Sequence, residues 1–393
     1  MKQKTYLDYN ASAPMRPQVI THMSDIMQAP HNASAVHQFG RDGKRLIDTA
    51  RRQIASITGA DENNVIFNSG ATEGNNTVLK HFAAKGRVLV SDMDHPSVLD
   101  VIPEAEKIPS LKSGLVNLAA LEEMLKDGKT ELVSVMLVNN ETGIIQPIAE
   151  ISKLAQRHGA FVHCDCTQAL GRLALAINAL GIHFMTCASH KIGGPQGVGA
   201  LILGLCGETP VLLEGGGQEK RARSGTENVA GIAGFGLAAE LAQKHMDDYQ
   251  KLAQLRDYLE NEMLKIHQLS SRAKSRDLRP ESEDSSTSLR YGRNDEGLKF
   301  YGQDLERVPN TSMFSIPGTS SETMLMAFDL EGIALSNGSA CSSGSVKASH
   351  VLKAMGASDE DASSALRVSL GWDSTQEDIN AFLRAFEKIV NRL

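Results

Sequence analysis

The sequence predicts an α/β fold whose core is a mainly parallel sheet covered by helices. Runs rich in β-branched and other apolar residues, typical of strands, occur at residues 65–68, 87–91, 131–138 and 161–166. Helical patterns alternate with them, and one starts at Pro147 and ends at Gly159, as these residues prefer at helix ends. Such alternation indicates a parallel sheet, which binds ligands at the carboxyl ends of its strands.

Polar side chains follow several of these predicted strands. Ser69, His95, Asn140 and Asp165 all fall at carboxyl ends. The first strand also runs through Gly70 into a helix, an arrangement that presents free backbone N–H groups to an anion such as phosphate. An ordinary turn between a strand and a helix is the alternative interpretation of that glycine.

Composition limits the classes of function. A chain of 393 residues favours one large domain plus a smaller one. Its net charge of -7 argues against nucleic acid or an anionic membrane as the main partner. We find no signal peptide and no apolar run long enough to cross a bilayer, and five scattered cysteines form neither a disulfide framework nor a zinc site. These features predict a cytoplasmic protein in a reducing compartment.

The C-terminal half changes in character along its length. A long helical stretch at 229–266 leaves the large domain, and residues 270–306, rich in serine and in both charges, are predicted as a surface insertion or mobile loop. A strand at 311–318 and a helix at 321–332 follow. The last helix is expected to start with a capping box formed by Ser374 and Glu377.

The stretch 163–197 carries the strongest chemical signal. Lys191 stands between His190 and a Gly-Gly-Pro turn, and Asp165 lies at a predicted strand end. A pyridoxal phosphate (PLP) enzyme needs a lysine for the Schiff base and an acid that keeps the pyridine nitrogen protonated. A phosphate cradle at Gly70 would complete the set. A solvated surface lysine is the alternative.

Several neighbours fit a cofactor of that kind. His95, before a proline, could stack on a flat ring or move protons near neutral pH, or could be a structural histidine. Asn140 and Gln168 are neutral donors suited to a phenolate oxygen, or could satisfy loop backbone. Cys164 and Cys166 should point away from the side chain between them and serve as small core residues.

Two further residues lie near the C-terminus. Cys341 sits in the serine- and glycine-rich stretch 336–345, an odd place for a structural thiol, and near an electrophilic cofactor it becomes a candidate nucleophile. Arg367 could grip a substrate carboxylate with two hydrogen bonds, although a structural ion pair explains it equally well.

Together these motifs resemble the cysteine desulfurases, PLP enzymes of the aminotransferase class V group, over nearly the whole chain apart from 270–306. The short serine-rich cysteine loop is similar to the subgroup that serves iron–sulfur and nitrogenase-type assembly. The matching motifs, in order, are YLDYNASAP, FNSGATEGNN, DHPSV, VNNETG, HCDCTQALG, SHKIGGPQGVGAL, GGGQEKRARSGTENV, GSACSSG and ALRVSLG.

The resemblance implies the type I aminotransferase-like, PLP-dependent transferase fold. It places a large PLP-binding domain at 16–240 and a smaller α+β domain at 1–15 and 241–393, which carries the cysteine loop. It also implies a homodimer in which Thr226 enters the neighbouring subunit's site. By position it assigns the Schiff base to Lys191, the pyridine nitrogen to Asp165, ring stacking to His95, cofactor contacts to Asn140 and Gln168, the phosphate cup to Ala71, Thr72 and His190, the substrate carboxylate to Arg367, and the persulfide to Cys341.

The implied activity converts L-cysteine to L-alanine and passes the sulfur from Cys341 to an iron–sulfur scaffold or another acceptor protein. No permanent metal site is implied, although Cys341 could transiently ligate an iron–sulfur cluster. His95 is the candidate base for the thiol. Alternatives are another class V enzyme, such as a selenocysteine lyase or an aminotransferase, and a catalytically weakened homologue acting as a binding subunit.

Two departures from the family pattern stand out. The family usually has Ser-x-His-Lys at the phosphate cup, whereas this chain has Ala188 in place of that serine. One hydroxyl contact with the cofactor is therefore missing, or Ser189 replaces it, and cofactor affinity is the property affected. The other departure is the predicted insertion, which could alter the motion of the cysteine loop or the docking of a partner.

Overall fold

We describe a computed structural model covering residues 4–204, 208–277, 297–338 and 348–392, with the side chains of 271–277 left aside. Its centre is a seven-stranded sheet in the order β2-β8-β7-β6-β5-β3-β4. Strands β3 to β7 run parallel where they pair, and β8 is antiparallel to both β2 and β7. The predicted α/β class with a mainly parallel sheet is confirmed. The strands are β2 (Val65–Asn68), β3 (Arg87–Ser91), β4 (Glu106–Ile108), β5 (Thr130–Ser134), β6 (Phe161–Asp165), β7 (Phe184–Ala188) and β8 (Gly199–Leu203).

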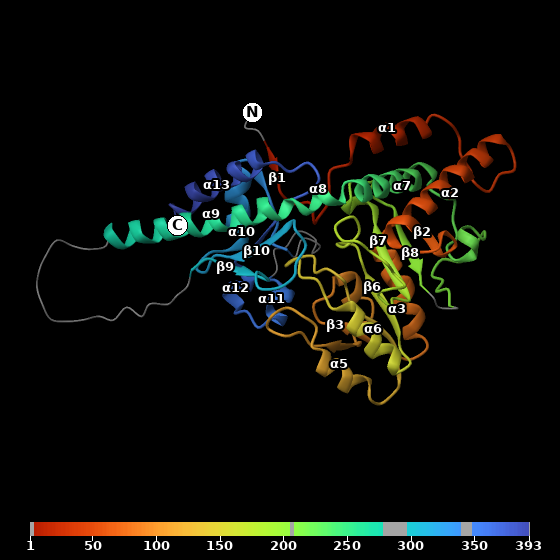
Figure 1. Ribbon diagram of the computed structural model, residues 1–393, viewed down its shortest axis with the longest axis horizontal. Helices are drawn as coiled ribbons and strands as arrows, with labels where there is room; N and C mark the ends of the chain where they lie inside the picture. Colours follow the sequence, from red (N-terminus) through yellow and green to blue (C-terminus); the bar gives the residue numbers. More distant parts are fainter. Residues whose placement is uncertain (1–3, 205–207, 278–296, 339–347, 393) are drawn as a thin grey trace, which may run out of the picture.

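Both faces of this sheet are buried, since successive residues of a strand pack into hydrophobic clusters on opposite faces. Leu89 belongs to one hydrophobic cluster, whereas Val88 and Val90 belong to another on the opposite face. Residues of α2, α6 and α7 pack in the first cluster and residues of α3 in the second. Figure 1 shows α2 and α7 side by side. The helices of this part are α1 (Pro17–Ile26), α2 (Gln38–Thr58), α3 (Ala71–Ala83), α4 (Pro96–Leu99), α5 (Leu118–Leu125), α6 (Ile148–Arg157) and α7 (Val229–Lys244).

A further hydrophobic cluster, apart from the two on the faces of the sheet, unites the two ends of the chain. Leu7 packs with residues of the C-terminal half, and Phe328, Phe382 and Phe386 form a stack within the same cluster. The strands here are β1 (Thr5–Tyr6), β9 (Lys299–Tyr301), β10 (Thr311–Ser315), β11 (Ile333–Ala334) and β12 (Ala365–Ser369). The helices are α8 (Met246–Gln250), α9 (Leu252–Asp277), α10 (Ser321–Leu330), α11 (His350–Ala354), α12 (Asp359–Ser363) and α13 (Gln376–Val390).

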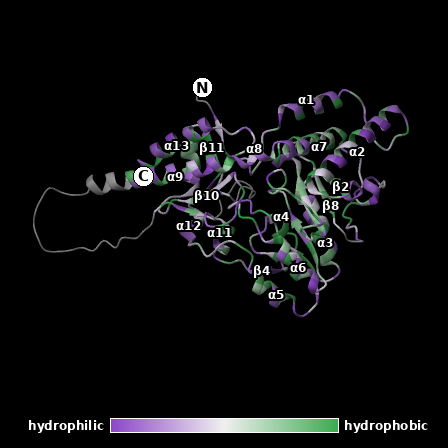
Figure 2. Cartoon of the chain, in the orientation of Figure 1, coloured by the Kyte–Doolittle hydropathy of each residue, from purple (hydrophilic) through white to green (hydrophobic). Residues whose placement is uncertain are grey.

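The separation of this cluster from those on the sheet supports, as a proposal, the division into a large domain at 16–240 and a small domain at 1–15 and 241–393. In Figure 2 hydrophilic residues follow the outer helices α1 and α13, as expected of helices with one face on a core. Within the described residues, no helix combines the length and apolar character that a membrane span needs.

Several predicted boundaries are wrong. The segment 270–306 is not an insertion throughout: α9 continues to Asp277, and β9 pairs antiparallel with β10 and completes a three-stranded sheet. Residues 278–296 lie outside the described chain. The stretch 229–266 is divided among α7, α8 and α9 instead of forming one helix.

Two other local predictions also shift. The capping box uses Thr375 and Asp378, one residue later than predicted, because the Ser374 hydroxyl accepts a bond from the Gly371 N–H instead. Strand β5 ends at Ser134, although the N–H groups of Val135 and Leu137 still donate to carbonyls of β6 and the following chain keeps its course beside that strand.

Candidate active site

A cavity of about 420 Å³ opens at the carboxyl ends of the parallel strands. It brings together eight of the residues predicted from the sequence. These are Ala71, Thr72, His95, Asn140, Asp165, Gln168, His190 and Lys191. They come from the ends of β2, β3, β5, β6 and β7, as expected for an open parallel sheet.

Lys191 lies in a short 3₁₀ turn, Ser189–Lys191, directly after β7. Its Nζ donates to the carbonyl oxygens of Asn10 at 2.6 Å and Ala11 at 2.9 Å, so the N-terminal segment fixes the position of the amine. The glycines that follow are needed for the turn. Gly193 has φ +83°, and a Cβ there would meet the Arg16 side chain at 2.8 Å.

Asp165, the last residue of β6, is buried at 7% exposure and is held by two donors. Its Oδ1 accepts from the Thr167 N–H at 2.9 Å, and its Oδ2 accepts from the Asn75 side chain at 2.8 Å. These two bonds hold the carboxyl group in place at the cavity wall, where a cation could approach it. A pyridinium nitrogen is a cation of that kind.

His95 is the N-cap of the short helix α4 and is linked to Asp165 by hydrogen bonds. Its Nδ1 accepts from the Ser97 N–H at 3.1 Å and lies 2.8 Å from the Ser97 hydroxyl. That hydroxyl accepts at 2.9 Å from the same Asn75 amide that binds Asp165. Burial lowers the pKa of His95, which favours the neutral ring. Because a backbone N–H can only donate, we place the ring proton on Nε2.

That arrangement sharpens the prediction that His95 is a base. The nitrogen able to accept a proton is already engaged by Ser97, so taking a proton from a thiol at Nε2 first requires a change of tautomer. Sequence reasoning missed Asn75 and Ser97. Neither has a motif of its own, and only the fold brings positions 75, 97 and 165 together.

At Gly70 a helix start lines the cavity, as predicted from the sequence. Gly70, at φ +152°, is the N-cap of α3 and provides no side-chain cap, and Ala71 and Thr72 form the first turn beside it. Burial, with the nearby charge of Lys191, lowers the pKa of His190 to about 4, so this ring is neutral at pH 7. A helix N-terminus flanked by a neutral ring and a hydroxyl suits a phosphate group.

The structure answers the question raised by Ala188. Neither Ala188 nor Ser189 lines the cavity. Ser189 is fully buried, and its Oγ lies 2.1 Å from where a Cβ on Gly194 would stand, so it faces that glycine. Ser189 therefore does not replace the hydroxyl of the family's serine, and Thr72 remains as a hydroxyl from the predicted cup.

The remaining lining atoms fit PLP. Within the described residues, Asn140 Oδ1, Thr167 Oγ1 and Gln168 Oε1 are buried and lack hydrogen-bond partners. Buried polar atoms of this kind are costly unless a ligand satisfies them. A carboxylate for a ring nitrogen, an amine for an aldehyde, side-chain amides for ring oxygen and a helix N-terminus for phosphate are all present.

Three predicted residues lie elsewhere. Arg367, on β12, does not line the cavity; it donates to Asp8 at 2.6 Å and to the Asn140 carbonyl at 2.8 Å, so the ion pair considered as its alternative is present. Thr226 is exposed in a neighbouring cavity that shares Ser69 and Gly197 with this one. Cys341 lies outside the described residues.

Cys164 and Cys166 are confirmed as core residues, both fully buried in the hydrophobic cluster on one face of the sheet. Burial raises the pKa of Cys164, which makes this thiol a poor nucleophile. Together with Cys187 they are the described cysteines, and all three are buried.

Comparison with known proteins places this site in a family. The aminotransferase class V family matches residues 5–283 and 281–382, and the match enters the segment predicted as an insertion. Cysteine desulfurase IscS of Dictyoglomus turgidum is 36% identical, covering 100% of this chain and 96% of that protein. The IscS of Pectobacterium atrosepticum is 34% identical, covering 100% and 94%.

Solved structures agree with the sequence relatives. A NifS-like protein from Rickettsia africae has a TM-score of 0.83 at 36% identity, covering 98% of this chain and 99% of that one. A structure of SspA in complex with cysteine has a TM-score of 0.73 at 26% identity, covering 93% and 98%. The chain therefore belongs to the aminotransferase class V family and is a cysteine desulfurase.

Proposed function

We propose that this cysteine desulfurase binds PLP in the 420 Å³ cavity, converts L-cysteine to L-alanine, and carries the sulfur as a persulfide on Cys341 to an iron–sulfur scaffold or another acceptor protein. The observation that carries the proposal is that Lys191 and Asp165 line one cavity, with the Gly70 helix start between the same walls. The related SspA structure contains cysteine, which supports the substrate.

Bound PLP would supply an electron sink for charge that develops on the substrate's α-carbon. Lys191 would attach the cofactor and, once displaced, move a proton at that carbon with its Nζ. Asp165, fixed by Asn75 and Thr167, would hold the proton at the ring nitrogen. His95, kept neutral, would stack on the ring.

Sulfur transfer is assigned to Cys341. Its thiolate would bond to the substrate sulfur as the carbon–sulfur bond breaks, leaving a persulfide while the carbon gains a proton to give alanine. The described residues before and after Cys341 both contact Glu141. A Cβ on Gly338 would meet the Glu141 side chain at 2.9 Å, and the Ser349 hydroxyl donates to the same carboxylate. Glu141 directly follows Asn140, a lining residue.

Arg367 is proposed to bind the substrate carboxylate. Its Nε is buried without a partner among the described residues, which leaves one donor available. Because its Nη2 is paired with Asp8, a two-point grip on a carboxylate would require that pair to rearrange. Thr226 is exposed and thus accessible to a second subunit, which supports a homodimer. We also propose a cytoplasmic location.

Product analysis tests the proposal. The protein is incubated with L-cysteine and a thiol reductant, and alanine and sulfide are measured with and without a candidate scaffold protein. We expect Lys191→Ala to lose the visible absorbance of bound PLP, and Cys341→Ala to keep that absorbance but lose sulfide. Absence of both products from the wild-type chain would refute it. Activity with selenocysteine but not with cysteine would indicate a selenocysteine lyase. Absence of PLP absorbance in the wild-type protein would indicate a catalytically weakened binding subunit.

A further inference from the structure

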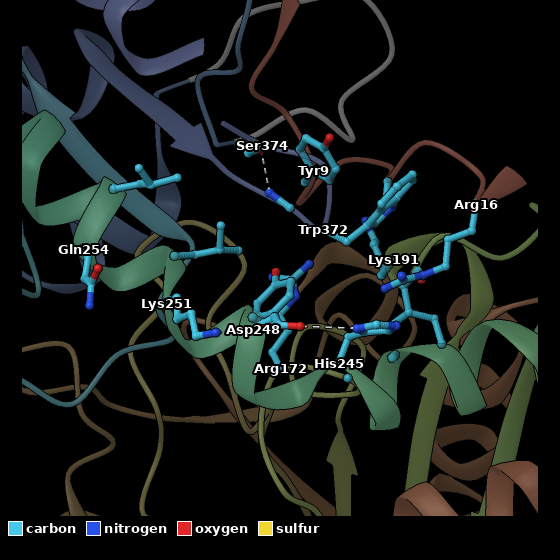
Figure 3. A pocket seen from close by; sticks show the side chains of 18 of the residues that line it. Tyr9, Arg16, Arg172, Lys191, His245, Asp248, Lys251, Gln254, Trp372 and Ser374 are labelled. Atoms are coloured by element: carbon cyan, nitrogen blue, oxygen red, sulfur yellow. Dashed lines mark hydrogen bonds and ion pairs between the residues drawn. The ribbon is translucent and has the colours of Figure 1, made fainter. Parts of the chain in front are cut away.

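A second cavity, of about 510 Å³, lies behind Lys191 and is separate from the cofactor cavity. Its walls come from the N-terminal segment, from the α7–α9 region and from the loop after β12 (Figure 3). In that view Arg16, Trp372 and Lys191 lie on one side, and His245 lies beside Asp248. Lys191 is the catalytic residue that lines both cavities.

Two guanidinium groups in this wall are buried without carboxylate partners in the described chain. Arg172 is 1% exposed; its Nη1 donates to Asn10 Oδ1 at 2.7 Å, and its Nε and Nη2 have no partner there. Arg16 is 8% exposed; its Nε donates to the Ile192 carbonyl at 3.1 Å, and its guanidinium lies 5.0 Å from the Trp372 ring centre.

The other charged groups of the wall do not neutralise these arginines. Asp248 is its only described carboxylate, and it is already bound by Lys251 at 2.8 Å and by His245 at 3.3 Å. Burial raises the pKa of Tyr249, so this phenol is uncharged at neutral pH. The cavity therefore has an excess of positive charge beside buried, unsatisfied N–H donors.

Burying a cation without a counterion or a full set of acceptors costs several kcal/mol by general estimates. An anion bound in the cavity would remove that cost, because guanidinium groups bind carboxylate and phosphate oxygens in a planar geometry. A cavity of this volume lies within the usual range for small-molecule sites, about 300–1,000 Å³.

We propose that this cavity is a binding site for a small oxyanion, a carboxylate or a phosphate, held by Arg172 and Arg16. The site does not depend on the proposed PLP chemistry, since its lining is distinct except at Lys191. Trp372 provides a direct probe of occupancy, because it is the only tryptophan in the sequence and lines the cavity.

The test uses the full-length protein with its proposed PLP linkage reduced by borohydride, so that the proposed phosphate cup of the first cavity stays occupied. Sodium phosphate and sodium succinate are titrated separately against sodium chloride of equal ionic strength while Trp372 emission is recorded. We expect saturable change with at least one oxyanion and none with chloride. The phosphate and succinate arms distinguish the two sources of oxyanion.

Matched variants locate the binding. Arg172→Gln should weaken the affinity about tenfold or more, the usual loss for a hydrogen bond to a charged group. Lys244→Gln, at the exposed end of α7 and outside the lining, should leave it unchanged. Should circular dichroism show that Arg172→Gln does not fold, Lys251→Gln at the exposed rim replaces it, with a smaller expected loss. Equal responses to chloride and both oxyanions, or an affinity unchanged in the rim and arginine variants, would overturn the proposal.

Discussion

Replacing Asn75 with alanine tests whether the hydrogen-bond chain from Asp165 to His95 controls the site. The Asn75 amide donates to Asp165 Oδ2 at 2.8 Å and to the Ser97 hydroxyl at 2.9 Å. Asn75→Ala removes both bonds and leaves Asp165 with the Thr167 N–H as its remaining described donor. We therefore expect a direct loss in the stabilisation of the charged carboxylate.

The size of the effect follows from the chemistry of the lost bond. A hydrogen bond to a charged group contributes about 1.5–3 kcal/mol, and about 1.4 kcal/mol corresponds to tenfold. Because Asp165 is buried, water cannot fully replace the missing donor. Asn75→Ala should thus lower kcat/KM for alanine formation by about ten- to a hundredfold and shift the pH at which the absorbance of bound PLP changes.

The neighbouring residue supplies a matched control. Asn76 is one position later on the same helix, and its side chain donates to its own helix at Thr72 O, 2.9 Å away. Asn76→Ala should therefore leave both kcat/KM and the PLP spectrum close to wild type. If Asn75→Ala lowers only the melting temperature while its spectrum and kinetics match those of Asn76→Ala, the residue is structural and the reasoning fails.

Three further predictions concern pH, cofactor affinity and the turn after the lysine. Burial lowers the pKa of His163 from 6.5 to about 4. As the pH falls from 6.5 to 4 the unfolded chain binds a proton at this residue and the folded chain does not, so the free energy of unfolding should fall by about 3 kcal/mol. In denaturant unfolding measured across this pH range, His163→Asn should show a weaker dependence of the free energy of unfolding on pH. Thr72→Val should weaken PLP binding about tenfold, whereas Ser189→Ala should not, as measured by equilibrium dialysis, and the reverse order would contradict the assignment of the cup. Gly193→Ala should destabilise the protein by about 1–2 kcal/mol and reduce PLP loading because its φ is +83°, and unchanged melting would contradict this.

Where one short segment carries the signal, the position of a residue in the fold could be predicted from the sequence. Asp165 at a strand end and Lys191 before a glycine turn are local features, and the alternating pattern was sufficient to place both at one edge of the sheet. The helix start at Gly70 is local too. By contrast, β9 is a three-residue strand whose formation depends on pairing with β10, so composition alone indicated a loop.

Asn10 shows why the remaining contacts could not be predicted. Its carbonyl accepts from Lys191 and Gln168, and its side-chain oxygen accepts from Arg172 and Asn310, residues that are remote in sequence. No periodicity or spacing encodes these contacts, because they form only when the folded chain brings the remote residues to Asn10. Asn10 also links residues of the two cavities, because its carbonyl accepts from the Lys191 amine and its Oδ1 accepts from the buried Arg172 guanidinium. A shift of Arg172 is therefore expected to act on the position of the amine through a single residue.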